Sequence, residues 1–252
     1  MIEVKELSKT YGDKPVVNNV SVNIQKGKIT SFIGPNGAGK STLLSAVSRL
    51  IKYDIGNIDI DHQSISQWKN RDLSKKMAIL KQANNITVRL TVRELVSFGR
   101  FPYSQGNLTS EDIDHINEAI AFMELENLEN QYLDELSGGQ KQRAHIAMVI
   151  AQDTDYILLD EPLNNLDMKH AVQIMKVLRR LVDELGKTVV IVIHDINFAS
   201  FYSDYIVALK EGEIINQGPV DDIIEESSLK EIYDMDIPIK QLDRCKVCVY
   251  FG

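Results

Sequence analysis

Apolar and polar residues alternate in the first part of the chain, which is the pattern of β-strands buried on one face. Val20, Val22 and Ile24 are separated from one another by polar residues. Two further stretches predict strands, Ile29–Ile33 before a glycine-rich loop and Met77–Leu80 further along the chain. The first part of the chain is therefore expected to be rich in β-structure.

The pattern becomes helical between residues 91 and 151. Ile113, Ile116, Ile120 and Met123 follow one another at steps of three and four. This spacing places the four side chains on one face of a helix. We expect a helical insert here.

The last part of the chain returns to strands that alternate with helices. Tyr156–Leu159 and Val189–Ile193 are continuous apolar runs, which are typical of parallel strands buried on both faces. A helical pattern lies between them, and Gly186 is expected to end that helix. Ile206–Leu209 and Glu213–Ile215 predict a β-hairpin.

These elements predict an α/β fold in a single domain of residues 1–252. A core lobe is expected to combine residues 1–85 and 152–252. Residues 86–151 are expected to form a second, helical lobe. The absence of repeats, low-complexity runs and linkers supports this organisation.

Composition restricts the function classes. Of the charged side chains 28 are basic and 36 are acidic, whereas a protein that wraps nucleic acid needs a basic face. No stretch approaches the ~20 apolar residues of a membrane-spanning helix, so we expect a cytosolic protein. Cys245 and Cys248 form a lone CxxC in a strand-like context, and we expect plain thiols because zinc would need four ligands.

Residues 34–41 fit the phosphate-binding pattern GxxxxGK[ST], between a predicted strand and a predicted helix from Ser41 to Leu50. The glycines allow successive backbone N–H groups to point at a phosphate, and the helix N-terminus adds a positive partial charge. Lys40 would supply a full charge to the β- and γ-phosphates, and the Ser41 hydroxyl would be a Mg²⁺ ligand. The sequence therefore predicts a nucleotide site.

Two carboxylates follow the apolar run at residues 156–159. The ends of parallel strands are where ligands bind in open α/β sheets. Asp160 is expected to hold Mg²⁺, and Glu161 is expected to orient the attacking water.

The stretch Leu136–Gln140 reads LSGGQ. With the loop and the acidic pair, it makes the chain resemble the ATP-binding-cassette (ABC) transporter family over nearly its whole length. Its free N–H groups at the start of a helix, expected at Lys141–Ala151, would form a second phosphate site. The resemblance implies a P-loop NTPase (RecA-like) core and a head-to-tail homodimer in which this second site serves the ATP of the other subunit.

The resemblance also implies roles for single residues. Lys40, Glu161 and His194 would be catalytic, with His194 contacting the γ-phosphate. Ser41, Gln82 and Asp160 would serve Mg²⁺. The residues implied to contact ATP are Tyr11, Gly34, Asn36, Gly37, Gly39, Lys40, Ser41, Thr42, Gln82, Ser137, Gly138, Gly139, Gln140 and Asp167.

One position departs from the family pattern. Asn164 stands where many members have serine or threonine. Asn can still donate and accept hydrogen bonds, so we expect tuned coupling between the two nucleotide sites and not a loss of activity.

The resemblance narrows the function further. The stretch from Leu95 to Tyr103 resembles the GRxPY-type segment of importers for ferric siderophores, haem and cobalamin. Phe98, Phe101 and Tyr103 would contact the transmembrane permease subunits, although each could instead pack internally. This favours the ATPase subunit of a bacterial siderophore importer, peripheral on the cytoplasmic membrane face and indirectly served by an extracellular lipoprotein. A soluble ATPase of iron–sulfur cluster assembly, or an importer for haem, cobalamin or another substrate, stays open.

Overall fold

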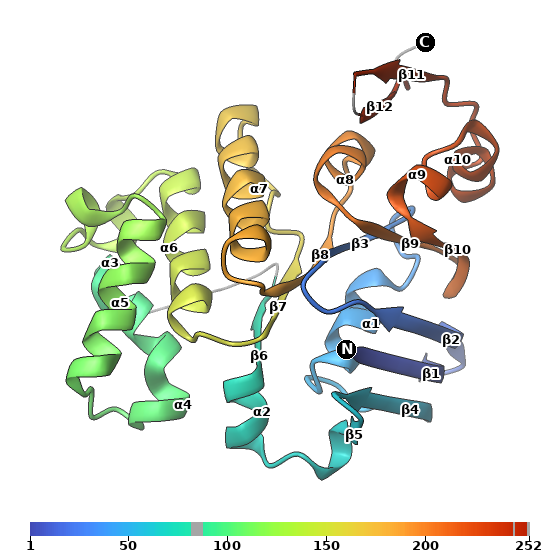
Figure 1. The fold of residues 1–252 in the computed structure, drawn as a ribbon. Helices are drawn as coiled ribbons and strands as arrows, with labels where there is room; N and C mark the ends of the chain where they lie inside the picture. Colours follow the sequence, from blue (N-terminus) through green and yellow to red (C-terminus); the bar gives the residue numbers. More distant parts are fainter. Residues whose placement is uncertain (82–87, 244, 251–252) are drawn as a thin grey trace. The chain divides into compact units, whose positions relative to one another are not determined.

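The alternating residues of the first part form an antiparallel sheet in the computed structural model, which describes residues 1–81, 88–243 and 245–250 (Figure 1). Strand β1 (Ile2–Tyr11) pairs with β2 (Lys14–Ile24) and with β4 (Ile55–Ile60), which continues to β5 (Gln63–Ser64). Val20, Val22 and Ile24 are buried, as their alternation predicts.

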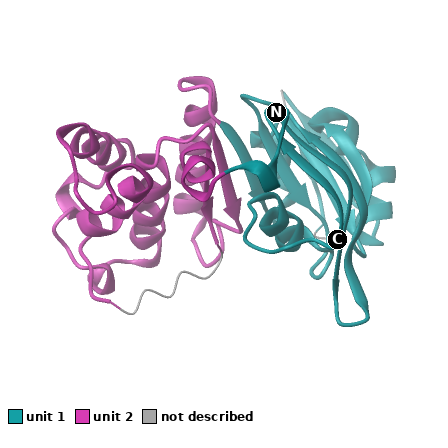
Figure 2. Ribbon diagram, turned by 90° about the horizontal axis from the view of Figure 1, so that it is seen from below, with its two compact units in different colours: residues 1–68, 188–252 teal, residues 69–187 magenta. Residues whose placement is uncertain are grey.

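The chain divides into two compact units (Figure 2). The first unit comprises residues 1–68 and 188–252, and the second comprises residues 69–187. The two-lobe division expected from the sequence has other boundaries and stays a prediction. Each unit is described by itself below.

The core of the first unit is built on parallel strands. Strand β3 (Ile29–Ile33) pairs in parallel with β8 (Thr188–Val192) and with β9 (Tyr205–Lys210), and β9 forms an antiparallel hairpin with β10 (Glu213–Pro219). Every residue of β3 and β8 is buried. The predicted parallel strands and hairpin are confirmed, and helix α1 (Lys40–Val47) follows β3 after the glycine loop.

The C-terminal part of the first unit packs on helix α8 (Ile196–Tyr202). The other elements of this unit are η1 (Ile65–Gln67), α9 (Val220–Ile223), α10 (Glu226–Tyr233), β11 (Ile239–Leu242) and β12 (Cys245–Cys248). The side chain of Asn197 donates to the carbonyl of Cys248 and accepts from its N–H, at 3.2 and 2.8 Å. The predicted strand around the cysteines is confirmed, and burial raises the pKa of the Cys248 thiol to about 11.

The second unit contains the predicted helical insert together with strands β6 (Met77–Leu80) and β7 (Tyr156–Asp160), which pair in parallel. Its helices are α2 (Asn70–Lys76), α3 (Val92–Ser97), η2 (Phe98–Arg100), α4 (Phe101–Ser104), α5 (Ser110–Phe122), η3 (Glu126–Leu128), η4 (Leu133–Glu135), α6 (Gly138–Ala151) and α7 (Met168–Asp183). Helices α3 and α5 both pack against α6.

Two predictions from the helical pattern can be compared with the structure. The predicted helix is present as α5, where Ile116, Ile120 and Met123 are buried and Ile113, in the first turn, is 45% exposed. Helix α7 ends as predicted, because Gly186 adopts a φ of 63° and its N–H donates to the carbonyl of Val182.

Candidate functional site

The glycine-rich loop of the first unit joins the end of β3 to the N-terminus of α1. Lys40 is 4% exposed, and its ammonium donates to the carbonyl oxygens of Gly34 and Pro35, at 2.7 and 2.8 Å. Gly34 and Gly39 have φ angles of 132° and 97°, a region that side chains rarely adopt. The Lys40 ammonium thus links two backbone carbonyls of the loop that precedes it.

Neighbouring backbone leaves no room for side chains at these two glycines. A Cβ on Gly34 would lie 1.9 Å from the carbonyl oxygen of Leu209, and a Cβ on Gly39 would lie 2.4 Å from that of Val16. The loop is therefore clamped between β2 and β9. A backbone held in this way is preorganised to present N–H groups to an anion.

A tyrosine from the C-terminal part also holds the loop. The N–H of Gly34 donates to the hydroxyl of Tyr233, at 3.1 Å, and burial raises the pKa of Tyr233 to about 12. The hydroxyl therefore stays protonated at neutral pH. Sequence reasoning missed Tyr233, because a lone tyrosine at the end of a helix carries no motif.

The other predicted nucleotide residues of the first unit lie in the loop, in the first turn of α1 and at the end of β1. Asn36 and Gly37 are exposed at the tip of the loop, and Ser41 and Thr42 are half-buried in the first turn of α1. Tyr11 is 52% exposed at the end of β1, with the Lys9 ammonium 5.3 Å from its ring centroid.

His194 follows strand β8 and is exposed. The backbone on either side is fixed, because Ile193 donates its N–H to the Phe32 carbonyl at 3.2 Å. On the other side the Asp195 carboxylate caps α8 by accepting from the N–H groups of Asn197 and Phe198. The backbone of His194 is thus held on both sides at the end of β8.

In the second unit, strand β7 carries the acidic pair. Asp160 is the last residue of the strand and is 7% exposed. Glu161 is half-buried and leaves the strand with a φ of 50°, in the left-handed region. A non-glycine residue in this region is uncommon and often marks a functional turn. The turn continues to Asn164, whose side-chain amide donates to the Glu161 carboxylate.

The LSGGQ stretch forms the start of helix α6. This helix begins at Gly138, so the expected start at Lys141 was wrong by three residues. The reason is a capping box: the Ser137 hydroxyl accepts from the N–H of Gln140, and the Gln140 side chain accepts from the N–H of Ser137. Both glycines therefore belong to the first turn, where N–H groups lack helical partners.

Asp167 and His170 support this first turn from within the same unit. Asp167 is the N-cap of α7, and its Oδ1 accepts from the backbone N–H of His170 at 2.9 Å. This hydrogen bond lowers the pKa of Asp167, and Oδ1 also lies 2.8 Å from the His170 ring Nδ1. The ring lies against Gly139, where a Cβ would be 2.6 Å from the imidazole Cγ. Sequence reasoning missed this role of His170.

A Gly139→Ala substitution is therefore expected to destabilise the chain by roughly 1–3 kcal/mol through overpacking. The added methyl group would meet an imidazole that Asp167 holds in place. Removing the ring in Gly139→Ala/His170→Ala should restore most of the free energy of unfolding, measured by urea denaturation. His170→Ala alone is the control, and additive losses in the double variant would contradict the contact.

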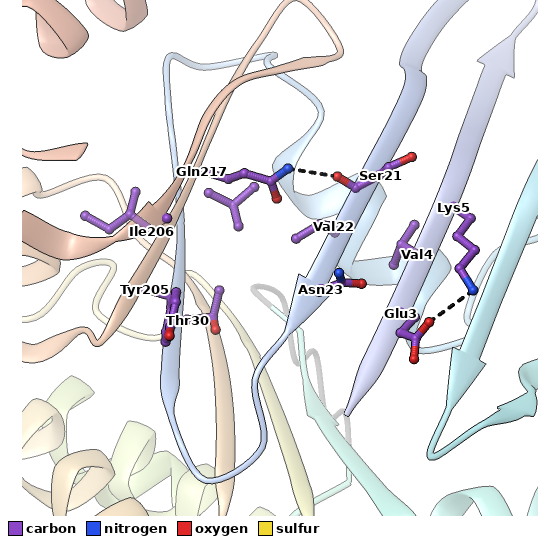
Figure 3. Close-up of a pocket in the computed structure, with 12 residues that line it drawn as sticks. Glu3, Val4, Lys5, Ser21, Val22, Asn23, Thr30, Tyr205, Ile206 and Gln217 are labelled. Atoms are coloured by element: carbon purple, nitrogen blue, oxygen red, sulfur yellow. Dashed lines mark hydrogen bonds and ion pairs between the residues drawn. The ribbon is translucent and has the colours of Figure 1, made fainter. Parts of the chain in front are cut away.

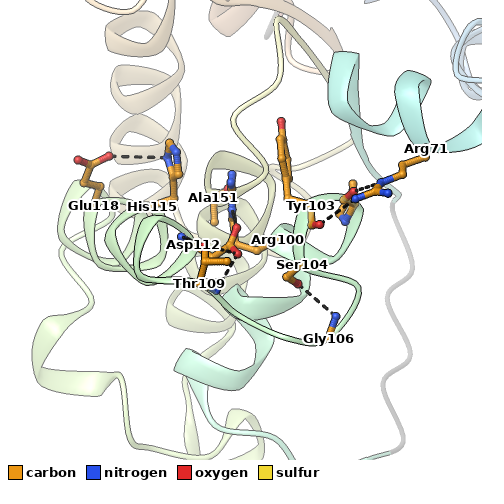
Figure 4. Close-up of polar contacts among 11 residues, drawn as sticks. Arg71, Arg100, Tyr103, Ser104, Gly106, Thr109, Asp112, His115, Glu118 and Ala151 are labelled. Carbon is orange, nitrogen blue, oxygen red and sulfur yellow. Dashed lines mark hydrogen bonds and ion pairs between the residues drawn. The ribbon is translucent and has the colours of Figure 1, made fainter.

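The segment predicted to meet a permease is anchored by a buried ion pair (Figure 4). The Arg100 guanidinium donates to Asp112 at 2.9 Å and to the carbonyl of Ala151 at 2.9 Å, and both charged side chains are buried. Burial by itself would raise the pKa of Asp112, but hydrogen bonds from Thr109 and Arg100 outweigh it and the pKa is lowered.

The three aromatic side chains of this segment differ in exposure. Phe98 and Phe101 are 52% and 59% exposed. Tyr103 is half-buried, with the Arg100 guanidinium 3.9 Å from its ring centroid and the Lys75 ammonium 4.8 Å from it. The two phenylalanines are thus available to another molecule, whereas Tyr103 packs largely within its own unit.

Several features lie apart from these residues. Gln82 falls outside the described residues. A cavity of about 400 Å³ in the first unit is lined by β1, β2, β9 and β10, including Glu3, Lys5 and Gln217, and by no predicted site residue among those described (Figure 3). In the described part of the chain, no cluster of three or more His, Cys, Asp and Glu residues could hold a metal ion. Across the same residues, no helix is long and apolar enough to cross a membrane.

A parallel-stranded core that delivers a glycine-rich loop to the start of a helix defines a P-loop nucleotide-binding protein. Residues 17–164 match the family model described as ABC transporter. The chain is 68% identical over 252 residues to the petrobactin import ATP-binding protein YclP of Bacillus subtilis (strain 168), with 100% of both chains covered. It is 49% identical over 250 residues to the petrobactin import ATP-binding protein FatE of Bacillus anthracis, covering 99% of this chain and 100% of the relative.

A solved structure gives the same result. The dimeric structure of MJ0796, a bacterial ABC transporter cassette, has a TM-score of 0.78 and 35% sequence identity, and the match covers 87% of this chain and 99% of that chain. This chain belongs to the ABC transporter family. It is an ATP-binding cassette with ATPase activity, and the predicted resemblance to the siderophore-import branch and the predicted P-loop fold are confirmed.

Proposed function

We propose that this ATPase is the nucleotide-binding subunit of a bacterial importer for ferric siderophores. The observation that carries the proposal is the full-length similarity to the petrobactin import ATP-binding protein YclP, at 68% identity. The exposed phenylalanines Phe98 and Phe101 support it, because a cassette that drives a permease needs an apolar contact surface.

Within this proposal the first unit binds the nucleotide. Backbone N–H groups of the loop, from Gly34 to Gly39, would surround the phosphates, and Lys40 would add its charge to the β- and γ-phosphates. ATP would draw the Lys40 ammonium away from the two loop carbonyls it now contacts. Tyr11 would lie against the adenine ring, where its exposed face allows stacking.

The residues proposed to serve Mg²⁺ offer the oxygen donors that this ion prefers. They are the Ser41 hydroxyl, the Asp160 carboxylate and Gln82. Mg²⁺ commonly binds through one or two protein oxygens together with substrate phosphates and water, so the lack of a larger acidic cluster among the described residues is compatible with it. When bound, the ion would neutralise charge on the phosphates.

Hydrolysis is proposed to use Glu161 and His194. Glu161 would orient the attacking water and accept its proton, and His194 would contact the γ-phosphate. Ser137 and Gly138 are exposed at the free N–H groups of α6, which suits a phosphate carried by another subunit. We therefore propose a head-to-tail homodimer that closes on ATP and opens on product release, with Gly139, Gln140 and Asp167 at its interface.

The transmembrane permease is proposed to bind at Phe98, Phe101 and Tyr103, with the two more exposed phenylalanines as the main contacts. This places the chain on the cytoplasmic face of the membrane. The siderophore would be delivered to the permease by a separate extracellular lipoprotein and would never touch this subunit.

Replacing Phe101 with aspartate is expected to weaken co-purification with the permease at least about tenfold, because truncating or charging an apolar anchor commonly removes 2 kcal/mol or more of binding. ATP binding by the purified chain should stay unchanged. Phe201→Asp is the matched control, since Phe201 is 62% exposed on α8 in the first unit. Equal loss in both variants, or in neither, would argue against this surface.

The import function itself is tested by uptake of radioactive iron. Cells lacking this chain should fail to accumulate iron supplied with petrobactin, and the wild-type chain should restore uptake. Unchanged uptake from this siderophore, with iron–sulfur enzymes impaired instead, would favour the soluble cluster-assembly alternative.

A further inference from the structure

Asn164 makes a contact that its family position did not predict. Its side-chain amide donates to Oε2 of Glu161, three residues earlier. The backbone repeats the connection, because the N–H of Asn164 lies 3.3 Å from the carbonyl oxygen of Glu161. The two residues therefore close a short turn at the end of β7.

The backbone of this turn restricts where both side chains can go. Glu161 and Asn165 have φ angles of 50° and 60°, and Pro162 between them fixes its own φ. Pro162 is buried, whereas Asn164 is exposed. The turn thus holds the start of the asparagine side chain beside the glutamate, and its amide reaches one bond further than a serine hydroxyl would.

We propose that Asn164 is a positioning residue for Glu161. This inference rests on the proposed role of Glu161 in orienting the attacking water. The donated hydrogen bond holds Oε2 of Glu161 at the Asn164 amide. It also restricts a side chain with three rotatable bonds. A carboxylate has about four acceptor sites, so an amide on Oε2 leaves the group able to accept from water.

The position is suited to an isosteric test. Asn164→Asp keeps the size and shape of the side chain but replaces the donor with an ionised acceptor. A role of Asn164 in packing alone would tolerate this substitution. The introduced carboxylate cannot donate to Oε2 and would displace the Glu161 side chain. Asn164→Ala removes the donor without adding charge.

The experiment measures phosphate release by the purified chain at neutral pH over a range of ATP concentrations, which gives kcat and KM separately. Asn164→Ala should lower kcat about tenfold, the cost of one hydrogen bond to a charged group, while KM for ATP changes less than about twofold. Asn164→Asp should lower kcat further, again with KM for ATP changed less than about twofold. Asn117→Ala is the matched control, since that exposed amide contacts Arg93.

The outcomes separate this inference from the proposed function. Wild-type kcat in Asn164→Asp, with Glu161→Gln inactive in parallel, would overturn the positioning role alone. Full activity of Glu161→Gln would overturn the role of Glu161 and the inference with it. If Asn164 acts through Glu161, adding Asn164→Asp to Glu161→Gln should not lower the residual turnover further.

Discussion

Replacement of Glu161 by glutamine is expected to lower ATP turnover by about 10²–10⁴-fold, the contribution typical of a general base. Glutamine keeps the size of the side chain and its place at the end of β7, but the neutral amide cannot accept a proton. Binding of ATP should stay intact, because the substitution leaves unchanged the loop and Lys40, which are proposed to hold the phosphates.

The same variant should accumulate as an ATP-bound dimer. If hydrolysis is what opens the proposed dimer, a chain that binds but does not hydrolyse remains closed. Size-exclusion chromatography with light scattering, in the presence of ATP, measures the dimer fraction. Glu118→Gln, an exposed position on α5 with the same isosteric change, serves as the control. A Glu161→Gln chain that stays monomeric at saturating ATP would contradict the closed-dimer mechanism.

Replacement of Lys40 by alanine is expected to weaken ATP binding on the order of 10–100-fold, which corresponds to about 1.5–3 kcal/mol for hydrogen bonds to a charged group. The effect has two sources. The phosphates lose a cation, and the carbonyls of Gly34 and Pro35 lose the donor that holds the loop in shape. Fluorescent-nucleotide titration measures the change in Kd.

The control for this variant is Lys240→Ala, an exposed lysine on β11 that leaves the loop untouched. Thermal unfolding of both variants shows whether the loss of affinity comes with a loss of fold, since Lys40 is buried. Unchanged ATP affinity in a folded Lys40→Ala chain would remove Lys40 from the nucleotide site.

The local elements could be predicted because their causes are local. The alternation around Val22 follows from side chains pointing to opposite faces of a strand, and the glycine and lysine pattern of residues 34–41 follows from what a phosphate needs. Ser137 and Gln140 form a capping box within four residues, yet the start of α6 was placed too late. Glycine has a low helix propensity, so Gly138 and Gly139 did not indicate a helix, although the cap at Ser137 defines where the helix begins.

The tertiary structure decided which distant groups meet these motifs. Tyr233 lies 199 residues from Gly34 in sequence and contacts its N–H, and strand pairing brings the Leu209 carbonyl against the same glycine. Packing of α6 on the start of α7 sets His170 against Gly139. Such contacts depend on strand register and helix packing over the whole unit, which no short stretch encodes.

The sequence by itself therefore determined which chemical groups this protein carries: a phosphate loop, an acidic pair and an LSGGQ helix start. Each could be predicted because backbone conformation and charge act over a few residues. Only the tertiary structure decided how those groups are held. It placed the Asn164 amide on Glu161, buried Arg100 against Asp112 and left Phe101 exposed beside a half-buried Tyr103. The exposure and the long-range contacts of a residue are properties of the packed chain, because both depend on which distant residues pack against it.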